Sequence, residues 1–209
     1  MTITIGIYIF DEMELLDFAG PYEVFTTASR VYRRTHPSEP DLFRVIAIGR
    51  TDSSVKARAG LNIQPDYYFG NHPPIDVPVI PGGVVTNELA RQDVIDWIKK
   101  ISSASRLTSS VCTGAFLLAQ AGLLNGKSAT THWEDIQDLK KMFPSLHVQT
   151  GQRWVDEGVI VTSAGISAGI DMSLHLVERL AGRELALGTA RQMEFDWVEN
   201  PAPEREAEA

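Results

Sequence analysis

Short apolar runs alternate along the chain with longer segments whose apolar residues recur at helical spacing. The apolar runs at 3–10, 42–49 and 107–111 are typical of strands that are buried on both faces. Three further segments are expected to contain strands, the first of them closing in a tight turn: 77–83, 147–156 and 159–162. Residues 55–68, which contain Gly60, Asn62 and Pro65, predict a short hairpin or meander.

The helical segments lie between these strands and after the last of them. Pro21 is well placed to start the first helix. The other helices are predicted at 87–102, 113–121, 133–142, 166–180 and 184–197. Strands that are separated by helical crossovers predict an α/β fold, with a mostly parallel sheet covered by helices on both faces.

The chain organisation favours one domain. The sequence contains no internal repeat and no low-complexity segment. We therefore expect a single domain over residues 1–198, followed by a tail at 199–209 that holds four glutamates and is expected to be flexible.

Composition narrows the classes of protein. The 209 residues are 44% hydrophobic and 22% charged, which is ordinary for a globular domain. The net charge is −8 and no basic run occurs, so we expect no nucleic-acid partner. No apolar stretch reaches the roughly 18 residues of a membrane span, and the N-terminus lacks the features of a signal peptide. The chain is expected to be soluble and cytoplasmic, without membrane contact.

Cys112 is the single cysteine, which excludes an intramolecular disulfide and a cysteine zinc cluster. It lies where a predicted strand ends and a helix begins, between Ser110 and Gly114. A nucleophile on such a sharp turn needs small neighbours, and a helix N-terminus behind it favours the thiolate and lowers the thiol pKa. The alternative is a buried structural cysteine, because cysteine is among the most buried residue types.

Two further features lie at the carboxyl ends of predicted strands, where ligand sites form in open α/β sheets. Asp17 stands in an apolar run that should raise its pKa and suit it to proton transfer near neutral pH. The alternative is a helix N-cap just before Pro21. Paired glycines, Gly82 and Gly83, let backbone N–H groups approach a ligand and form an anion hole.

The five histidines do not form a metal-ligand pattern, and we expect no metal. They are His36, His72, His132, His147 and His175. His132 is the one that follows the Cys112 helix closely, so it is a candidate for lining the site; a hydrogen-bonded core histidine is the alternative. Neither a Walker loop nor a Gly-x-Gly-x-x-Gly motif is present, so we expect no cofactor.

One motif imitates a serine hydrolase. Residues 165–169 match the Gly-x-Ser-x-Gly elbow around Ser167. Its possible partners Asp171 and His175 fall one turn apart on the same predicted helix, whereas a triad needs them on separate loops. We therefore interpret these small residues as sites of close helix packing.

Together these stretches resemble the DJ-1/PfpI superfamily, whose flavodoxin-like sheet is related to class I glutamine amidotransferases. The resemblance covers residues 3–197 and is carried by 16–25, 81–83, 110–119, 121–133 and 162–171. Within the superfamily, the stretches are most similar to enzymes that hydrate isonitriles. The resemblance implies a functional trio of Asp17, Cys112 and Thr113, a small-molecule substrate, no cofactor and a homodimer.

This sequence differs from other branches of the superfamily at two of the candidate site residues. PfpI-type proteases carry histidine where this chain has Thr113, and DJ-1 carries glutamate where it has Asp17. Regulators of the AraC type share similar stretches but continue into a helix-turn-helix region, for which we expect no room before Ala209. Two alternative functions stay open, a cysteine-based redox sensor without catalysis and a glyoxalase-like enzyme that acts on reactive carbonyls.

Overall fold

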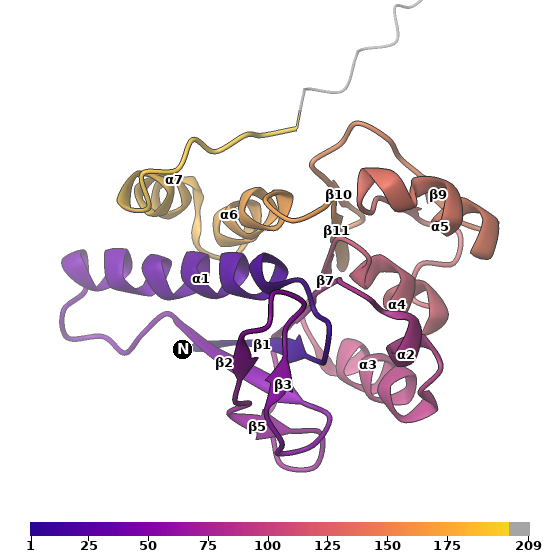
Figure 1. Cartoon of the computed structure of the whole chain (residues 1–209). Coiled ribbons are helices and arrows are strands. Elements are labelled where there is room, and N and C mark those ends of the chain that lie inside the picture. Colours follow the sequence, from indigo (N-terminus) through magenta and orange to yellow (C-terminus); the bar gives the residue numbers. More distant parts are fainter. Residues whose placement is uncertain (201–209) are drawn as a thin grey trace, which may run out of the picture.

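The computed structural model describes residues 1–200, which form a central sheet of seven strands with helices on both faces (Figure 1). The strand order is β10-β11-β7-β6-β1-β2-β5. All neighbours are parallel except β10 and β11, which confirms the predicted α/β class. In sheet order the bounds are β10 (Trp154–Asp156), β11 (Ile160–Ser163), β7 (Thr108–Val111), β6 (Val77–Ile80), β1 (Ile3–Ile9), β2 (Phe43–Gly49) and β5 (Tyr67–Tyr68).

Two small strand pairs lie outside this sheet. The predicted hairpin within residues 55–68 is present as β3 (Val55–Lys56) and β4 (Asn62–Ile63), which pair antiparallel before the chain joins the main sheet through β5. The second pair is β8 (Ser128–Ala129) with β9 (His147–Val148).

The helices divide the core into two layers (Figure 1). One layer packs α1 (Leu15–Thr35), α6 (Ala168–Ala181) and α7 (Arg183–Gln192) against one face of the sheet. The other layer contains α2 (Thr86–Leu89), α3 (Gln92–Ala104) and α4 (Gly114–Gln120). A short 3-10 turn, η1 (Trp133–Asp135), leads into α5 (Ile136–Met142). The strands between the layers are buried on both faces, as their apolar runs predict.

Three predicted helix boundaries are wrong. Helix α1 begins at Leu15, so Pro21 lies inside it, where the proline ring costs one backbone hydrogen bond of a 21-residue helix. The segment 87–102 contains two helices, because Arg91 is extended and its guanidinium pairs with the buried Glu88. The last helix ends at Gln192, after which Trp197 donates its indole N–H to the carbonyl of Asp171.

The described part of the expected tail contacts the fold. The side chain of Asn200 accepts the N–H groups of Arg153 and Trp154 and donates to the carbonyl of Trp154. Residues 201–209, the rest of that tail, lie outside the described residues. Among residues 1–200, no helix combines the length and the apolar character needed to cross a membrane.

Candidate functional site

Cys112 lies directly after β7, in a backbone conformation that side chains rarely adopt. Its φ is 56°, in the left-handed region, and its N–H donates to the carbonyls of Ser163 and Ala164, each at 3.2 Å. The turn is tight because Gly114 has no Cβ: a Cβ there would lie 2.0 Å from the carbonyl oxygen of Ile80. This is the strained strand-to-helix elbow that the small neighbours of Cys112 predict.

Asp17 lies in the first turn of α1 and is completely buried. Its Oδ2 accepts the N–H of Gly82 at 2.9 Å, whereas Oδ1 has no hydrogen-bond partner among the described residues. Burial, together with the nearby Glu14 carboxylate, raises the pKa of Asp17 to about 7, although the Gly82 N–H and the Cys112 thiol act to lower it. The direction agrees with the sequence prediction, and the N-cap alternative is wrong because Glu14 holds that position.

The pKa of the Cys112 thiol is raised, whereas the sequence predicts a lowered pKa. Burial raises its pKa to about 12, and the negative charge of Asp17 raises it as well. The N–H of Thr113, at the start of α4, lowers the thiol pKa as predicted, but burial and the neighbouring carboxylate outweigh it. At neutral pH the sulfur therefore holds its proton, while the carboxyl beside it is close to half ionised.

Thr113 is tied to Gly83 by two hydrogen bonds. The Thr113 hydroxyl donates to the carbonyl of Gly83 and accepts the Gly83 N–H, both at 2.8 Å. The N–H groups of Gly82 and Gly83, which the sequence suggests as an anion hole, are thus directed at Asp17 and Thr113 instead. These glycines position the elbow and the carboxyl group.

Gly82 and Gly83 must both be glycine, because a side chain at either position would clash with neighbouring backbone atoms. A Cβ at Gly82 would lie 2.5 Å from the backbone nitrogen of Thr113, and one at Gly83 would lie 2.3 Å from the carbonyl oxygen of Glu12. Gly83 also has a φ of 131°, which strains any other residue. The close approach of this loop to the Cys112 elbow depends on the missing side chains.

His132 lines the same cavity as Cys112, a hollow of about 350 Å³. Gly165 makes room for the imidazole, since a Cβ at that glycine would lie 2.0 Å from Cδ2 of His132. The Nδ1 atom accepts the N–H of Glu134 at 3.4 Å and lies 3.4 Å from a carboxylate oxygen of Asp135. The structure thus brings His132 to the site rather than to the core.

Sequence reasoning missed several groups around the cavity. The N–H of Ile166 acts on both candidate residues, because it lowers the pKa of Asp17 and of Cys112. The φ of Ile166 is 53°, in the left-handed region where a side chain is strained, and Ile166 is the second residue of the serine-hydrolase-like motif. The acidic side chains Glu14, Glu134 and Asp135 also line the cavity, which no local pattern in the sequence signals.

The serine-hydrolase motif does not assemble a triad. Asp171 is buried and pairs with Arg153, whereas His175 bonds to Asp156. Gly169 packs against Val111, where a Cβ would lie 2.8 Å from a methyl carbon. The predicted packing role is therefore confirmed for Gly169, whereas Gly165 makes room for His132 and Ser167 is exposed and bonds to Arg153.

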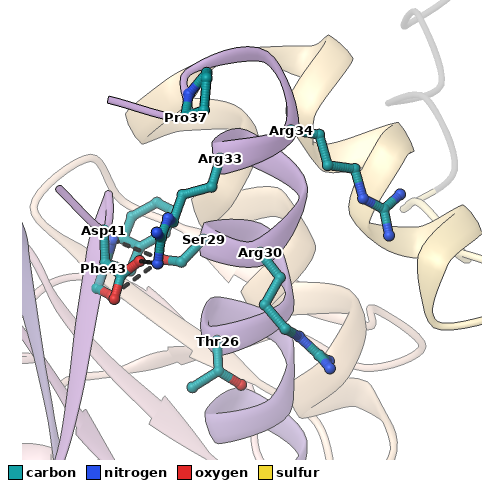
Figure 2. A pocket seen from close by; sticks show the side chains of 8 residues that line it. All are labelled: Thr26, Ser29, Arg30, Arg33, Arg34, Pro37, Asp41 and Phe43. Carbon is teal, nitrogen blue, oxygen red and sulfur yellow. Dashed lines mark hydrogen bonds and ion pairs between the residues drawn. The ribbon is translucent and has the colours of Figure 1, made fainter. Parts of the chain in front are cut away.

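A larger hollow of about 570 Å³ lies elsewhere, along the second half of α1 (Figure 2). Figure 2 shows Arg33 pointing toward Asp41, while Arg30 and Arg34 point away from it. The hollow borders Phe43 at the amino end of β2, and it shares no lining residue with the Cys112 cavity. Its two hydroxyl side chains, Thr26 and Ser29, donate to the backbone carbonyls of Tyr22 and Phe43, so the Cys112 cavity is the candidate active site.

Comparison with known proteins agrees with this geometry. The model of the DJ-1/PfpI family matches residues 3–179. Isonitrile hydratase from Pseudomonas putida is 34% identical over 204 residues, which cover 97% of this chain and 81% of that protein. A ThiJ/PfpI family protein from Pseudomonas syringae superimposes with a TM-score of 0.81 at 25% identity, covering 100% of this chain and 80% of the other.

The fold also occurs in proteins of a different class. The HTH-type transcriptional regulator GbdR from Pseudomonas aeruginosa is 29% identical over 94% of this chain. The chain spans 52% of that regulator's length. Similarity over this fold therefore extends to an enzyme and to a regulator alike.

Proposed function

Because the chain belongs to the DJ-1/PfpI family, we propose that it hydrates isonitriles to N-substituted formamides, with Cys112 as nucleophile and Asp17 as general acid and base. The observation that carries the proposal is the buried carboxyl of Asp17, with a pKa near 7, beside a thiol on a strained elbow. A general acid and base works best when its pKa lies near the working pH.

The first step adds sulfur and hydrogen to the same carbon. The terminal carbon of R–N≡C accepts the Cys112 sulfur while Asp17 takes the thiol proton, and Asp17 then delivers that proton to the same carbon. The product is a thioimidate, R–N=CH–S–Cys112. Asp17 Oδ1 has no other hydrogen-bond partner among the described residues, which leaves it available for this exchange.

The second step consumes water and restores the enzyme. Asp17 accepts a proton from water as the water oxygen bonds to the thioimidate carbon, and it passes that proton to the nitrogen. The carbon–sulfur bond then breaks, the hydroxyl proton returns to sulfur through Asp17, and R–NH–CHO leaves. One water molecule is consumed and no oxidant or reductant is needed.

Thr113 and the two glycines hold this pair in place. The Gly82 N–H fixes Oδ2 of Asp17, and the paired hydrogen bonds between Thr113 and Gly83 fix the loop against the elbow. We assign Thr113 a positioning role, because Gly83 already satisfies its hydroxyl as donor and as acceptor. Rigid placement of this kind lowers the cost of reaching the reactive geometry.

The test measures formamide formation from cyclohexyl isocyanide. Cys112→Ala is expected to lower the rate by orders of magnitude, as in other covalent mechanisms. Asp17→Asn should lower it by about 10²–10⁴, the range for a positioned acid and base. Ser167→Ala, which removes the serine of the hydrolase-like motif, is the matched control and should keep the wild-type rate. Full activity in Cys112→Ala would overturn the proposal.

The structure bears on one of the two alternative functions, and a second assay tests the other. Redox sensing favours an accessible thiolate, whereas Cys112 is 6% exposed and its pKa is raised, so the sensor reading lacks support. A glyoxalase-like enzyme would use the same pair of residues. Lactate formed from methylglyoxal, with no turnover of any isonitrile, would establish that alternative.

A further inference from the structure

The cavity that opens on Cys112 is lined by more acidic than basic side chains. Glu14, Glu134 and Asp135 face it, together with a single guanidinium, that of Arg58. The Arg58 side chain is 61% exposed and that of Glu134 is 65% exposed, so solvent screens much of both charges. The less exposed charged groups of the lining are the carboxylates of Glu14 and Asp135, which are 25% and 35% exposed, and Arg58 lies 4.0 Å from Glu14.

This charge reaches the reacting groups. The Glu14 carboxylate raises the pKa of Asp17, and the Asp135 carboxylate raises the pKa of Cys112. Both effects have the sign that a negative potential produces at the sulfur and at the acid. Protein walls of low dielectric focus such a field inside a cleft.

The wall next to the cavity is largely apolar. An adjoining groove of about 550 Å³ shares Gly83, Thr113 and Asp135 with the cavity. Its apolar lining consists of Val84, Val85, Leu89, Phe116 and Met142, and Asp138 and Lys141 add one charge of each sign. A substituent that leaves the reacting carbon in this direction therefore lies against hydrocarbon, with the Asp135 carboxylate beside it.

We propose that this cavity selects substrates whose substituent is neutral and apolar or cationic, and that it excludes those carrying an anionic group near the reacting carbon. Glu14 and Asp135 are the residues that impose this selection, and Arg58 opposes them. The inference rests on the proposed function for its substrate, since it specifies which isonitriles the enzyme hydrates. The field itself acts on any reagent that approaches Cys112.

The first test compares two substrates that differ in charge. Methyl isocyanoacetate is neutral, whereas isocyanoacetate carries a carboxylate two bonds from the isonitrile nitrogen. We expect kcat/KM for the ester to exceed that for the anion by about tenfold or more, the low end of the range for charge effects in clefts. Raising the ionic strength should narrow the difference. Equal values would overturn the proposal.

The second test does not depend on turnover. Cys112 is the single cysteine, so its alkylation is read directly from the intact mass. Iodoacetamide and iodoacetate are similar in size and differ in charge, and 2-mercaptoethanol provides the intrinsic ratio of their rates. We expect Cys112 to favour iodoacetamide over iodoacetate by about tenfold or more beyond that intrinsic ratio. A ratio equal to that of 2-mercaptoethanol would contradict the proposal.

Variants with opposite expected effects test whether Glu14 and Asp135 impose the charge selection and Arg58 opposes it. Glu14→Gln and Asp135→Asn should lower the preference for iodoacetamide, and Arg58→Ala should increase it. Asp93→Asn removes a carboxylate of α3 that lines neither hollow, and it should leave the ratio unchanged. A preference that stays constant in all four variants would contradict the assigned residues. If charge selection appears in alkylation but no isonitrile is hydrated, the proposed function fails and the selection stands.

Discussion

At the residue scale, the proposed chemistry depends on two side chains, those of Asp17 and Cys112. The sequence correctly predicts the raised pKa of Asp17, since its apolar neighbours are visible in the chain. It gives the wrong direction for Cys112, because the charge that raises the thiol pKa belongs to Asp17, which is distant in sequence and adjacent in space. The local sequence predicts the helix that follows Cys112, but it does not predict that the carboxyl group of Asp17 lies next to the thiol.

The reactivity of the thiol should depend on that carboxyl. Asp17→Asn removes the negative charge that raises the pKa of Cys112, so a larger fraction of the thiol is ionised at pH 8. We expect iodoacetamide to alkylate Cys112 faster in this variant than in the wild type, as measured by intact mass over time. An unchanged rate of alkylation would show that the charge of Asp17 does not control the ionisation of the resting thiol.

The buried carboxyl should also make stability depend on pH. The folded-state pKa of Asp17, about 7, lies above the ordinary value of 3.8 for an aspartate, so between these pH values the native state holds a proton that the unfolded state has released. Its stabilising contribution is therefore present below about pH 4 and is lost as the pH rises through about 7.

Asp17→Asn tests this relation through chemical unfolding. The variant should be more stable than the wild type at pH 8, by about 4 kcal/mol, and the difference should shrink toward pH 5. A gap that is the same at both pH values would show that Asp17 does not titrate in this range.

At the scale of the elements, the sequence predicts where the strands lie, but it does not predict that the helix expected at 87–102 is interrupted between α2 and α3. Glu88 bonds to Tyr8, which is 80 residues away, and this long-range contact places the interruption between α2 and α3. Likewise, the glycines after β6 are recognisable as a turn. Their N–H partners are set by α1 and by the Cys112 elbow, which the local sequence does not contain.

The turn after β6 should tolerate no side chain at Gly82. In Gly82→Ala the new Cβ meets Thr113 at 2.5 Å and must push the loop from the elbow. We expect a loss of about 1–3 kcal/mol of stability, typical of an overpacked site, together with lower formamide production. Gly188→Ala, in α7, is the control: its Cβ meets Val31 at 3.3 Å, and stability should change by less than about 1 kcal/mol. Equal stabilities of the two variants would contradict the role of Gly82.

For the whole molecule, the order of strands and helical crossovers was sufficient to predict the α/β class, whereas the family was predicted from the resemblance of particular stretches of sequence; both predictions are confirmed. The α/β class follows from alternation because buried parallel strands need apolar runs and connecting helices. The acidic cavity could not be predicted, since Glu14, Glu134 and Asp135 come from two distant segments that only the folded chain brings together.

The resemblance also predicts a homodimer. Light scattering on the purified chain should give twice the mass of one chain at micromolar concentration. A mass of one chain at all concentrations would contradict the predicted dimer.

The pH dependence of formamide formation tests the central claim most directly, because kcat/KM reports the ionisation of groups in the unbound enzyme. With a protonated Cys112 thiol next to Asp17, kcat/KM for cyclohexyl isocyanide should rise as the pH passes through about 7 and then stay level. In Asp17→Asn this rise should disappear along with most of the activity. A rate that rises instead through the ordinary range of a thiol, near pH 8.5–9, and does so equally in Asp17→Asn, would contradict the account.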